Sequence, residues 1–382
     1  MEIKNLKKGV KRILKAIKDE EKIILYGDSD MDGVGSVIIM KEAIKSAGGQ
    51  ASLVYFPDRE KDGYGITENA LKSFKKLSPA LLVSMDLGIG NFKEVILARE
   101  MGFDIVIIDH HEILGKVPKA NIVIDPKQKG DEYPFKTLAA AGLVYKFVEE
   151  MLGENLKGEL KNSFMELTAL ATIADMMPKQ ADNRVFIDEG TPLLKNSLRP
   201  GIKIFWEKDF FKQKLELSNK IFKIISLLNI RDVKYGFPAA YRLLTTGSPK
   251  EAQKIVEILL KKSEVRREKI EKIIEKVEKN IEGKSDSIIF EGSKEFESIL
   301  ISSAASILVG QHLKPVFLYK KMKTESLGTV RSLRGLDSVA LMKKCAKLLI
   351  TYGGHPMASG FRIKNENLEK FKECLIKNYK KN

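Results

Sequence analysis

The segment of the sequence with the most potential for chemistry runs from Tyr26 to Ser36 and reads YGDSDMDGVGS. It places aspartates at alternate positions, Asp28, Asp30 and Asp32, and follows them with two glycines. In a partly buried site these carboxylates would repel one another strongly unless cations neutralised them. The glycines allow tight turning at the start of a helix, where free amide groups favour a phosphate. The pattern indicates a metal site, and an acidic helix N-cap with solvated aspartates is the alternative.

A second candidate cluster comprises Asp109, His110 and His111, which follow the apolar run 105–108. The chain has 4 histidines, and two of them stand side by side directly after an aspartate. Neutral imidazole together with carboxylate suits Mn, Zn or Fe, whereas a site of oxygens alone would suit Mg or Ca. A lone buried histidine is usually structural, but this pairing favours contact with a metal or a phosphate.

Two more aspartates and a glycine-bearing segment complete the set of candidates. Asp86 follows the apolar run 81–85, and Asp175 ends an apolar helical stretch, where it could also be a simple cap. Far downstream, residues 353–355 read Gly-Gly-His, preceded by Arg331 and Ser332. A glycine pair lets backbone amides approach an anion closely, and Arg and His donate charged hydrogen bonds to phosphate. By itself a Gly-Gly-His sequence is more typical of a turn.

Short apolar runs that alternate with helical stretches must position these groups. The runs cover residues 23–26, 52–56, 81–85, 105–108 and 122–124. Such a pattern predicts a parallel sheet with helices on both faces. Asp28, Asp86, Asp109 and Asp125 follow four of the runs, and the carboxyl ends of strands in an open α/β sheet line one crevice. We therefore expect several carboxylates to converge there, with Asp86 on the strand that neighbours both clusters.

The remaining chain reads as helices followed by a second domain. An amphipathic helix is expected over residues 6–17, and helical patterns dominate 137–280, with breaks near Thr191-Pro192 and near residues 199–201. From residue 248 to 283 the pattern predicts one long connecting helix. Strands return at residues 287–290 and 315–319, where a second domain begins.

Length and composition agree with a two-domain globular protein. A chain of 382 residues exceeds the roughly 250 to 300 residues at which single cores stop growing. The net charge of +15 suits a phosphate-bearing partner, although a Lys-, Glu- and Ile-rich balance also has a stability explanation. No apolar run is long enough to span a membrane and no signal core follows the N-terminus, so we expect a cytoplasmic protein. Cys345 and Cys374 make neither a disulfide framework nor a zinc motif and are expected to be structural.

Taken in order, these segments resemble the DHH phosphoesterase superfamily, and within it the RecJ-like branch that carries a DHH-associated C-terminal domain with a Gly-Gly-His motif. The resemblance runs from about residue 22 to 363 and includes Arg59, residues 63–65 (Gly-Tyr-Gly) and the pair Asn183-Arg184. The chain departs from the branch at Leu87-Gly88, where a small or polar residue is common, and in showing no counterpart of the oligonucleotide-binding domain of longer members.

The resemblance implies a domain layout and a role for each candidate. It places a catalytic DHH domain at 1–195, a helical extension and connecting helix at 196–284, and a smaller α/β substrate-binding domain at 285–382. Two divalent cations, most often Mn with Mg or Co as alternatives, would be held by Asp28, Asp30, Asp32, Asp86, His110 and Asp175. Asp86 would bridge them, while Asp28 and His111 would support the site or touch substrate. Substrate phosphates would be bound by Arg331, Ser332, Gly353, Gly354 and His355.

The implied activity is a two-metal exonuclease that cleaves single-stranded DNA or short RNA to mononucleotides, working with replication or repair proteins and without a membrane. One alternative is a phosphodiesterase for short oligoribonucleotides or cyclic dinucleotides. Another, from a different class, is a replication-fork scaffold that keeps the fold without catalysis. A family-II pyrophosphatase ranks lower because its members carry a basic Arg-Lys-Lys segment in place of Gly-Gly-His.

Overall fold

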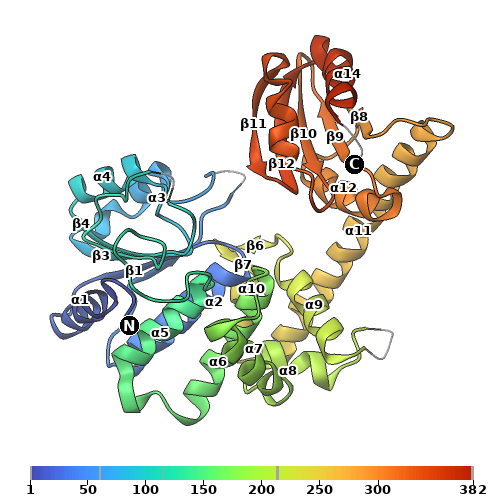
Figure 1. The fold of residues 1–382 in the computed structure, drawn as a ribbon. Coiled ribbons are helices and arrows are strands. Elements are labelled where there is room, and N and C mark those ends of the chain that lie inside the picture. The colour runs from blue at the N-terminus through green and yellow to red at the C-terminus, as the bar shows by residue number, and fades with distance from the viewer. Residues whose placement is uncertain (1, 60–61, 114, 212–214, 380–382) are drawn as a thin grey trace. The chain divides into compact units, whose positions relative to one another are not determined.

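The computed structural model describes residues 2–59, 62–113, 115–211 and 215–379. The chain divides into two compact units, Met1–Leu260 and Lys261–Asn382 (Figure 1). The segment predicted as a helical extension is shared between them, because its first helices pack in unit 1 and its long helix continues into unit 2. The layout in three functional segments remains a proposal.

Unit 1 is built on a five-stranded parallel sheet, as the alternating apolar runs predicted. The order is β2-β1-β3-β4-β5, and every neighbouring pair is parallel. The strands are β1 (Ile23–Gly27), β2 (Leu53–Tyr55), β3 (Ala80–Met85), β4 (Phe103–Ile108) and β5 (Ile122–Ile124). Since β3 pairs with both β1 and β4, Asp86 does follow the strand between the two acidic clusters.

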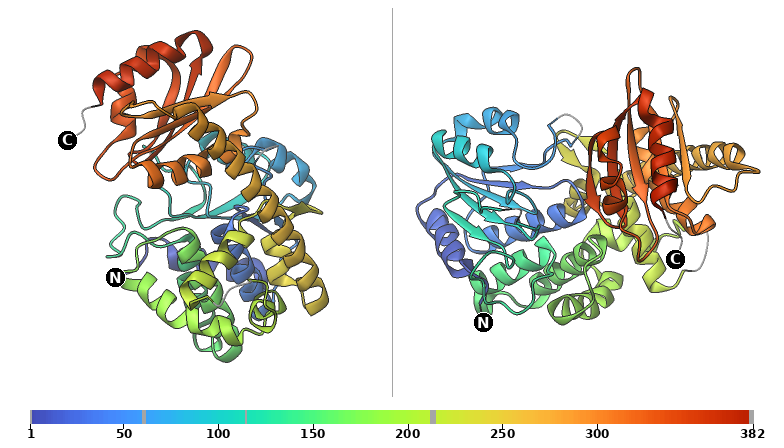
Figure 2. Two further views of the ribbon diagram at one scale, coloured as in Figure 1. Left: turned by 90° about the vertical axis from the view of Figure 1, so that its right-hand side faces the viewer. Right: turned by 45° about the horizontal axis from the view of Figure 1, so that its top comes forward.

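Helices cover both faces of this sheet because its strands are apolar on both sides. Leu25 and Val83 point to one face, which packs against α1 (Leu6–Lys18), α2 (Met31–Ser46) and α5 (Ala140–Leu152). Their neighbours Ile24 and Leu82 point to the other face, under α3 (Glu68–Ser73) and α4 (Phe92–Glu100). Each such buried side chain contributes about 1.5 to 3 kcal/mol to folding. The two views of Figure 2 show the same layers from other sides.

The rest of unit 1 is helical, with one exception that the sequence did not reveal. Its helices are α6 (Gly158–Ala174), α7 (Ala181–Leu193), α8 (Pro200–Glu207), α9 (Leu217–Leu228) and α10 (Ala239–Thr245). The predicted break near Thr191-Pro192 is confirmed, because α7 ends at Leu193, one residue after Pro192. The break near residue 200 is correct, since Pro200 begins α8. A short hairpin of β6 (Val233–Lys234) and β7 (Phe237–Pro238) interrupts the helices.

The predicted long helix is confirmed as α11 (Pro249–Ile281), and a second sheet follows it. The sheet has the order β11-β12-β10-β9-β8 and is antiparallel except for the β8–β9 pair. Its strands are β8 (Ile289–Ser293), β9 (Val316–Lys321), β10 (Glu325–Arg331), β11 (Leu349–His355) and β12 (Ala358–Lys364). One face packs on α11 and α12 (Ser298–His312), the other on α13 (Ser338–Lys343) and α14 (Leu368–Asn378).

The two cysteines, expected only to be structural, are joined in a disulfide between the segment after α13 and helix α14. Cys345 is buried. The two cysteines are 29 residues apart in the sequence, and the loop that their disulfide closes contains β11 and β12. The sequence offered no sign of this pair, because a spacing of that length says nothing about distance in the fold. Within the described part of the chain, no helix combines the length and the apolarity that crossing a membrane requires.

The disulfide is expected to stabilise unit 2 measurably. Closing a loop of about this length removes enough unfolded-state entropy to contribute about 3 to 4 kcal/mol. The double variant Cys345→Ala, Cys374→Ala should therefore unfold at lower denaturant concentration, and reduction of the wild type should lower its midpoint similarly. Reduction should leave the variant's midpoint unchanged. Detection of two free thiols by mass spectrometry of the alkylated, non-reduced protein would contradict the pairing.

Candidate metal centre

The aspartate loop between β1 and α2 is shaped by its own hydrogen bonds. Asp30 is the N-cap of α2, and its Oδ1 accepts from the amides of Asp32 and Gly33, each at 3.1 Å. A side chain at Gly33 would collide with the backbone of Asp28, since an added Cβ would lie 2.4 Å from the Asp28 oxygen. The loop therefore folds back tightly, and this closeness holds the alternate aspartates in one small region.

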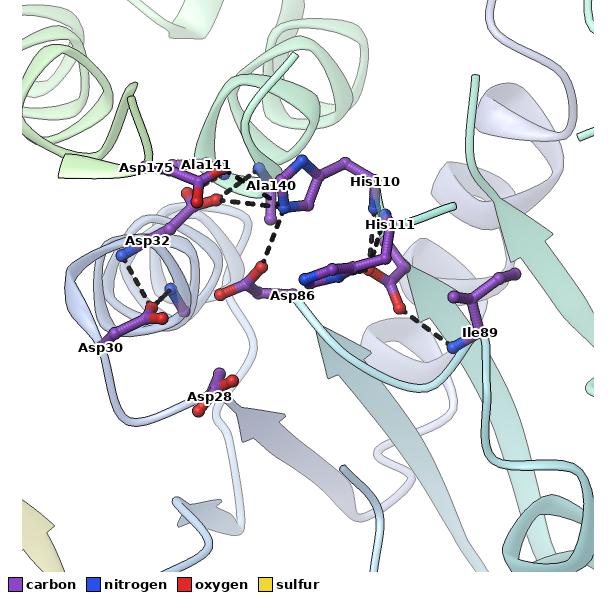
Figure 3. A network of polar contacts seen from close by, with 12 residues as sticks. Asp28, Asp30, Asp32, Asp86, Ile89, His110, His111, Ala140, Ala141 and Asp175 are labelled. Carbon is purple, nitrogen blue, oxygen red and sulfur yellow. Dashed lines mark hydrogen bonds and ion pairs between the residues drawn. The ribbon is translucent and has the colours of Figure 1, made fainter. Parts of the chain in front are cut away.

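Asp32 is anchored to a different helix. Its Oδ2 and Oδ1 accept from the amides of Ala140 at 2.7 Å and Ala141 at 2.8 Å, at the N-terminus of α5 (Figure 3). A carboxylate is favoured there by the unpaired amides and the positive end of the helix dipole. Burial, together with the charge of Asp175, nevertheless raises the pKa of Asp32 well above its ordinary value.

Asp86 and Asp175 each depend on an uncommon backbone conformation. Asp86 follows β3 with a φ of 64°, in the left-handed region, and its amide donates to the Ile108 oxygen at 3.0 Å. Asp175 is the C-cap of α6, and the next residue, Met176, has a φ of 54°. The amides of Met176 and Met177 bond back to Ile173 and Thr172, which ends the helix in a Schellman motif. Both turns aim a carboxylate at the same point.

His110 lies at that point. Its Nε2 is 3.2 Å from Asp86 Oδ1, 3.5 Å from Asp175 Oδ2 and 3.7 Å from Asp32 Oδ2 (Figure 3). Burial and the neighbouring His111 lower the pKa of His110 to about 4, so the ring is neutral at pH 7 and these contacts are not ion pairs. Both ring nitrogens are buried without a hydrogen-bond partner among the described residues. A neutral imidazole with a free lone pair facing carboxylates is the form that binds a metal ion.

Asp109 and His111 form a separate pair beside this cluster. The Asp109 carboxylate accepts from the amides of Ile89 and His110 and from His111 Nδ1, the last at 2.7 Å. Burial opposes ionisation, but the hydrogen bond and charge of His111 still leave the pKa of Asp109 lowered. The same hydrogen bond raises the pKa of His111, whose Nε2 lies 3.2 Å from the hydroxyl of Tyr64. Asp109 therefore orients His111 instead of contributing oxygens to the cluster.

Arg59, noted in the sequence only as part of the resemblance, is the cation of the cluster. Its Nε donates to Asp28 Oδ1 at 2.8 Å, and its Nη2 lies 2.6 Å from Asp28 Oδ2 and 2.9 Å from Asp30 Oδ2. Burial still raises the pKa of Asp28 despite this partner. The guanidinium thus neutralises Asp28 and also contacts Asp30, and among the described residues the other aspartates of the cluster have no arginine partner.

The structure brings the predicted ligands together in three overlapping groups. Ligand atoms lie within 4.8 Å of one another in each group: Asp86, His110 and His111; Asp32, His110 and Asp175; Asp28, Asp30 and Asp86. Asp86 and His110 each belong to two groups. Burial and neighbouring carboxylates raise the pKa of Asp86 strongly and that of Asp175 to about 6. The cluster is therefore unfavourable when ionised alone, as the sequence argument anticipated, and it fits divalent cations.

Not every candidate near the sheet edge joins the cluster. Asp125 follows β5 as expected, but it caps its own turn through the amide of Lys127 at 2.8 Å and belongs to none of the three groups. Glu112 is exposed and pairs with Lys127. Asn183 is buried and donates to the backbone oxygens of Thr137 and Pro178, so its role is structural. Of the four strand-end aspartates, Asp28 and Asp86 belong to these groups, whereas Asp109 and Asp125 do not.

In unit 2 the predicted phosphate contacts lie at one end of the sheet. Arg331, Ala358 and His355 occupy one register row across β10, β12 and β11. Arg331 donates to Ser306 Oγ at 3.1 Å and also bonds Ser302. Burial lowers its pKa. No acidic side chain is recorded as its partner among the described residues, so its charge is available to an anion.

The neighbouring candidates differ in accessibility. Gly353, Gly354 and His355 are exposed, and Gly354 has a φ of 126° with the Ala358 oxygen only 2.7 Å from where a Cβ would lie. A residue with a side chain would not fit there. Ser332 is buried and donates to the Leu336 oxygen at 3.1 Å, which closes the turn after β10.

Asn229, which sequence reasoning missed, holds the aspartate loop from a distant part of the chain. Its Oδ1 accepts from the Met31 amide at 3.0 Å, across 198 residues. Arg231 bonds Asp58 Oδ1 at 2.7 Å, next to Arg59. Neither residue stands in a local pattern that would have revealed these contacts.

Comparison with known proteins agrees with this geometry. Residues 22–172 match the model of the DHH family, N-terminal domain, and residues 285–381 match the DHHA1 domain. The single-stranded-DNA-specific exonuclease RecJ of Bacillus subtilis is 30% identical over 393 residues, which cover 98% of this chain and 48% of that protein. The chain therefore spans about half the length of this relative.

Solved structures share the fold over nearly the whole chain. The crystal structure of exonuclease RecJ bound to manganese superposes with a TM-score of 0.78 at 25% identity, covering 99% of this chain and 94% of that one. RecJ from Thermus thermophilus in complex with Mn²⁺ gives a TM-score of 0.79 at 23% identity, covering 99% of this chain and 55% of that one.

The affinity for Mn²⁺ is expected to rise with pH, because protons and cations compete for the same carboxylates. The pKa of Asp175 is raised from 3.8 to about 6, so its contribution to the stability of the metal-free protein is present at low pH and lost as the pH rises through that range. Release of this proton alone should strengthen Mn²⁺ binding about tenfold between pH 5 and pH 7. Calorimetric titration at both pH values measures the change. Asp175→Asn should bind more weakly with a shallower slope, and equal affinity at both pH values would refute the argument.

Proposed function

The chain belongs to the DHH family, and we propose that it is a metal-dependent exonuclease that cleaves single-stranded nucleic acid to mononucleotides. The observation that carries the proposal is the cluster of carboxylates around a neutral His110, whose ring nitrogens have no hydrogen-bond partner among the described residues. The similar RecJ chain of nearly matching length is described as bound to manganese, which supports a divalent cation at the same place. Mn is our first choice, with Mg or Co as alternatives.

Charge balance supports two cations. Asp28, Asp30, Asp32, Asp86 and Asp175 carry five negative charges when ionised, and Arg59 supplies one positive charge. The remaining four negative charges equal the charge of two divalent cations. Asp86 and His110, which each belong to two of the ligand groups, are the residues best placed to serve both.

The residues of the chain divide the work of phosphodiester hydrolysis among them. Divalent cations at such a site lower the pKa of water and offset charge on the phosphate. Asp32 and Asp30 are held in place by amides, and neutral His110 offers its lone pair without first losing a proton. His111, which Asp109 orients through a hydrogen bond that raises its pKa, lies at the exposed edge and can contact a phosphate oxygen.

The substrate-binding part of the proposal rests on unit 2. Arg331 and His355 stand in one register row, so they can bind phosphate oxygens of one strand, with the amides of Gly353 and Gly354 beside them. Phosphate contacts of this kind do not depend on the nucleotide sequence, and they weaken as the salt concentration rises. Single-stranded DNA is the substrate named for the relatives, and short RNA is an alternative. We place the enzyme in the cytoplasm with its substrate, alongside replication or repair proteins.

The alternatives make different predictions from the same residues. A phosphodiesterase for dinucleotides or cyclic dinucleotides would use the same cluster but would not need to bind a longer single strand of nucleic acid. A replication-fork scaffold would not need the ligands, yet the expected ligand types are present and converge. The comparisons favour neither alternative over the exonuclease.

Removal of a central ligand is expected to abolish cleavage without unfolding the protein. Asp86→Asn and His110→Ala should each lower the rate on end-labelled single-stranded DNA by more than the roughly 10- to 100-fold that loss of a supporting residue costs at a metal site. Gel analysis of digests with each metal measures the rate and the product length. Asp86→Asn keeps the size of the side chain and removes one charge.

Asp19→Asn, at the exposed end of α1, is the matched control, because it removes the same charge away from the cluster. It should cleave at the wild-type rate. Near-wild-type cleavage by a folded Asp86→Asn or His110→Ala would place the chemistry elsewhere.

The length of the substrate is expected to matter. With Mn²⁺, the wild type should release mononucleotides from a longer single strand faster than it cleaves a dinucleotide, because only the longer strand offers several phosphates for binding. It should leave a cyclic dinucleotide intact. Cleavage of the dinucleotide alone would favour the short-oligonucleotide phosphodiesterase. Absence of cleavage on every substrate, with each metal, would favour the scaffold.

A further inference from the structure

The hairpin of β6 and β7 carries an aromatic residue where neither folding nor burial explains one. Val233 pairs with Pro238 and Lys234 with Phe237, which leaves Tyr235 and Gly236 as a two-residue loop. Both have positive φ, 56° and 79°, the pattern of a type I′ turn. Asn-Gly is the preferred sequence for such a turn, and a bulky side chain in the first position is disfavoured.

The ring at this position is also largely exposed. Tyr235 is 83% accessible, and Lys234 Nζ lies 5.1 Å from the centroid of its ring. Burial therefore does not offset the cost of the left-handed backbone. When a residue breaks the local rule without a folding benefit, a functional role is the physical explanation to test.

The base of the hairpin is fixed to the metal cluster on two sides. Asn229, just before it, accepts from the Met31 amide in the aspartate loop. Arg231 bonds Asp58, whose neighbour Arg59 binds Asp28 and Asp30. Arg242 on α10 donates to the Asp232 backbone oxygen at 3.2 Å, which adds a third attachment at the start of the hairpin.

This attachment limits how far the tip can lie from the cluster. Six residue steps separate Asn229, which bonds the aspartate loop directly, from Tyr235, a reach of at most about 21 Å. That is about the length of six stacked nucleotides. A strand whose scissile phosphate lies at the cluster therefore has bases within reach of the Tyr235 ring.

We propose that Tyr235, with Lys234 beside it, is a stacking platform for one base of the single strand a few nucleotides from the scissile phosphate. The inference rests on the proposed nuclease function and adds a binding residue to it. An aromatic face accepts any unpaired base, and an adjacent lysine attracts the phosphates on either side. Because the faces of an internal base in a duplex are already covered, the platform selects single strands without reading sequence.

Two substitutions at Tyr235 distinguish the role of the aromatic ring from that of the turn conformation. Tyr235→Asn removes the ring and suits the left-handed backbone, so the hairpin and the melting temperature should be preserved or improved. Tyr235→Trp keeps an aromatic face. Phe222→Ala, which removes an exposed ring from α9 in the same unit, is the matched control.

Binding is measured by fluorescence anisotropy with a labelled single strand, in an Asp86→Asn background that prevents cleavage. Tyr235→Asn should weaken binding about 5- to 100-fold, whereas Tyr235→Trp and Phe222→Ala should stay within about twofold of the parent. A strand carrying 2-aminopurine at successive positions should show quenching at one position with Tyr or Trp and none with Asn. If Tyr235→Asn binds the strand as tightly as its parent and quenches 2-aminopurine to the same extent, the inference is overturned. The exposed hairpin tip would then be better explained as a contact for a protein partner.

Cleavage of a dinucleotide distinguishes failure of this inference from failure of the nuclease function on which it rests. In the active protein, Tyr235→Asn should cleave a dinucleotide as fast as wild type, because that substrate is too short to reach the platform, and should be slower on a long strand. If the wild type cleaves both substrates and the variant matches it on the long strand, the platform is refuted and the nuclease stands. If the wild type cleaves neither, the nuclease proposal fails, and the binding measurement still decides on the platform.

Discussion

The mutual repulsion of the buried carboxylates is the constraint on which the rest of unit 1 depends. Asp28, Asp32 and Asp86 are each no more than 3% exposed, and their pKa values are raised by burial and by neighbouring carboxylates. Such groups are tolerated only where other parts of the chain hold them and a positive charge compensates them. The amides of α5 and the guanidinium of Arg59 supply part of that compensation, and divalent cations are suited to supply the rest.

The same constraint explains why distant segments meet at the sheet edge. Parallel strands deliver Asp28 and Asp86 to one side, but the sheet alone would leave the carboxylates free to turn toward water. Left-handed backbone at Asp86, and at Met176 beside Asp175, fixes their direction at a conformational cost. Asn229 then ties the aspartate loop to the hairpin segment. The cluster is therefore held by contacts across most of unit 1, and not by its local sequence alone.

The sequence predicted what depends on repeated patterns and missed what depends on single contacts. The five parallel strands and α11 follow from apolar periodicity, and the position of Asp86 between both clusters follows from strand order. Strands β10 to β12 were not predicted, because glycines break their alternation: Gly328 faces Phe361, whose ring would lie 2.2 Å from an added Cβ. The β6–β7 hairpin is too short to carry a pattern, and Asp125 obeys the strand-end rule without joining the cluster.

These misses share a physical cause that bears on function. Periodicity reports burial, which is a property of whole elements. A site is made by exceptions, such as the exposed ring of Tyr235 and the buried nitrogens of His110, which lack a hydrogen-bond partner in the described part of the chain. Each exception costs stability, so it persists only where surrounding contacts over-determine the backbone. Arg242 and Arg231 do this for the hairpin, as α5 does for Asp32. A residue that is unfavourable in its own turn but firmly held by its neighbours is therefore the strongest structural pointer to chemistry in this chain.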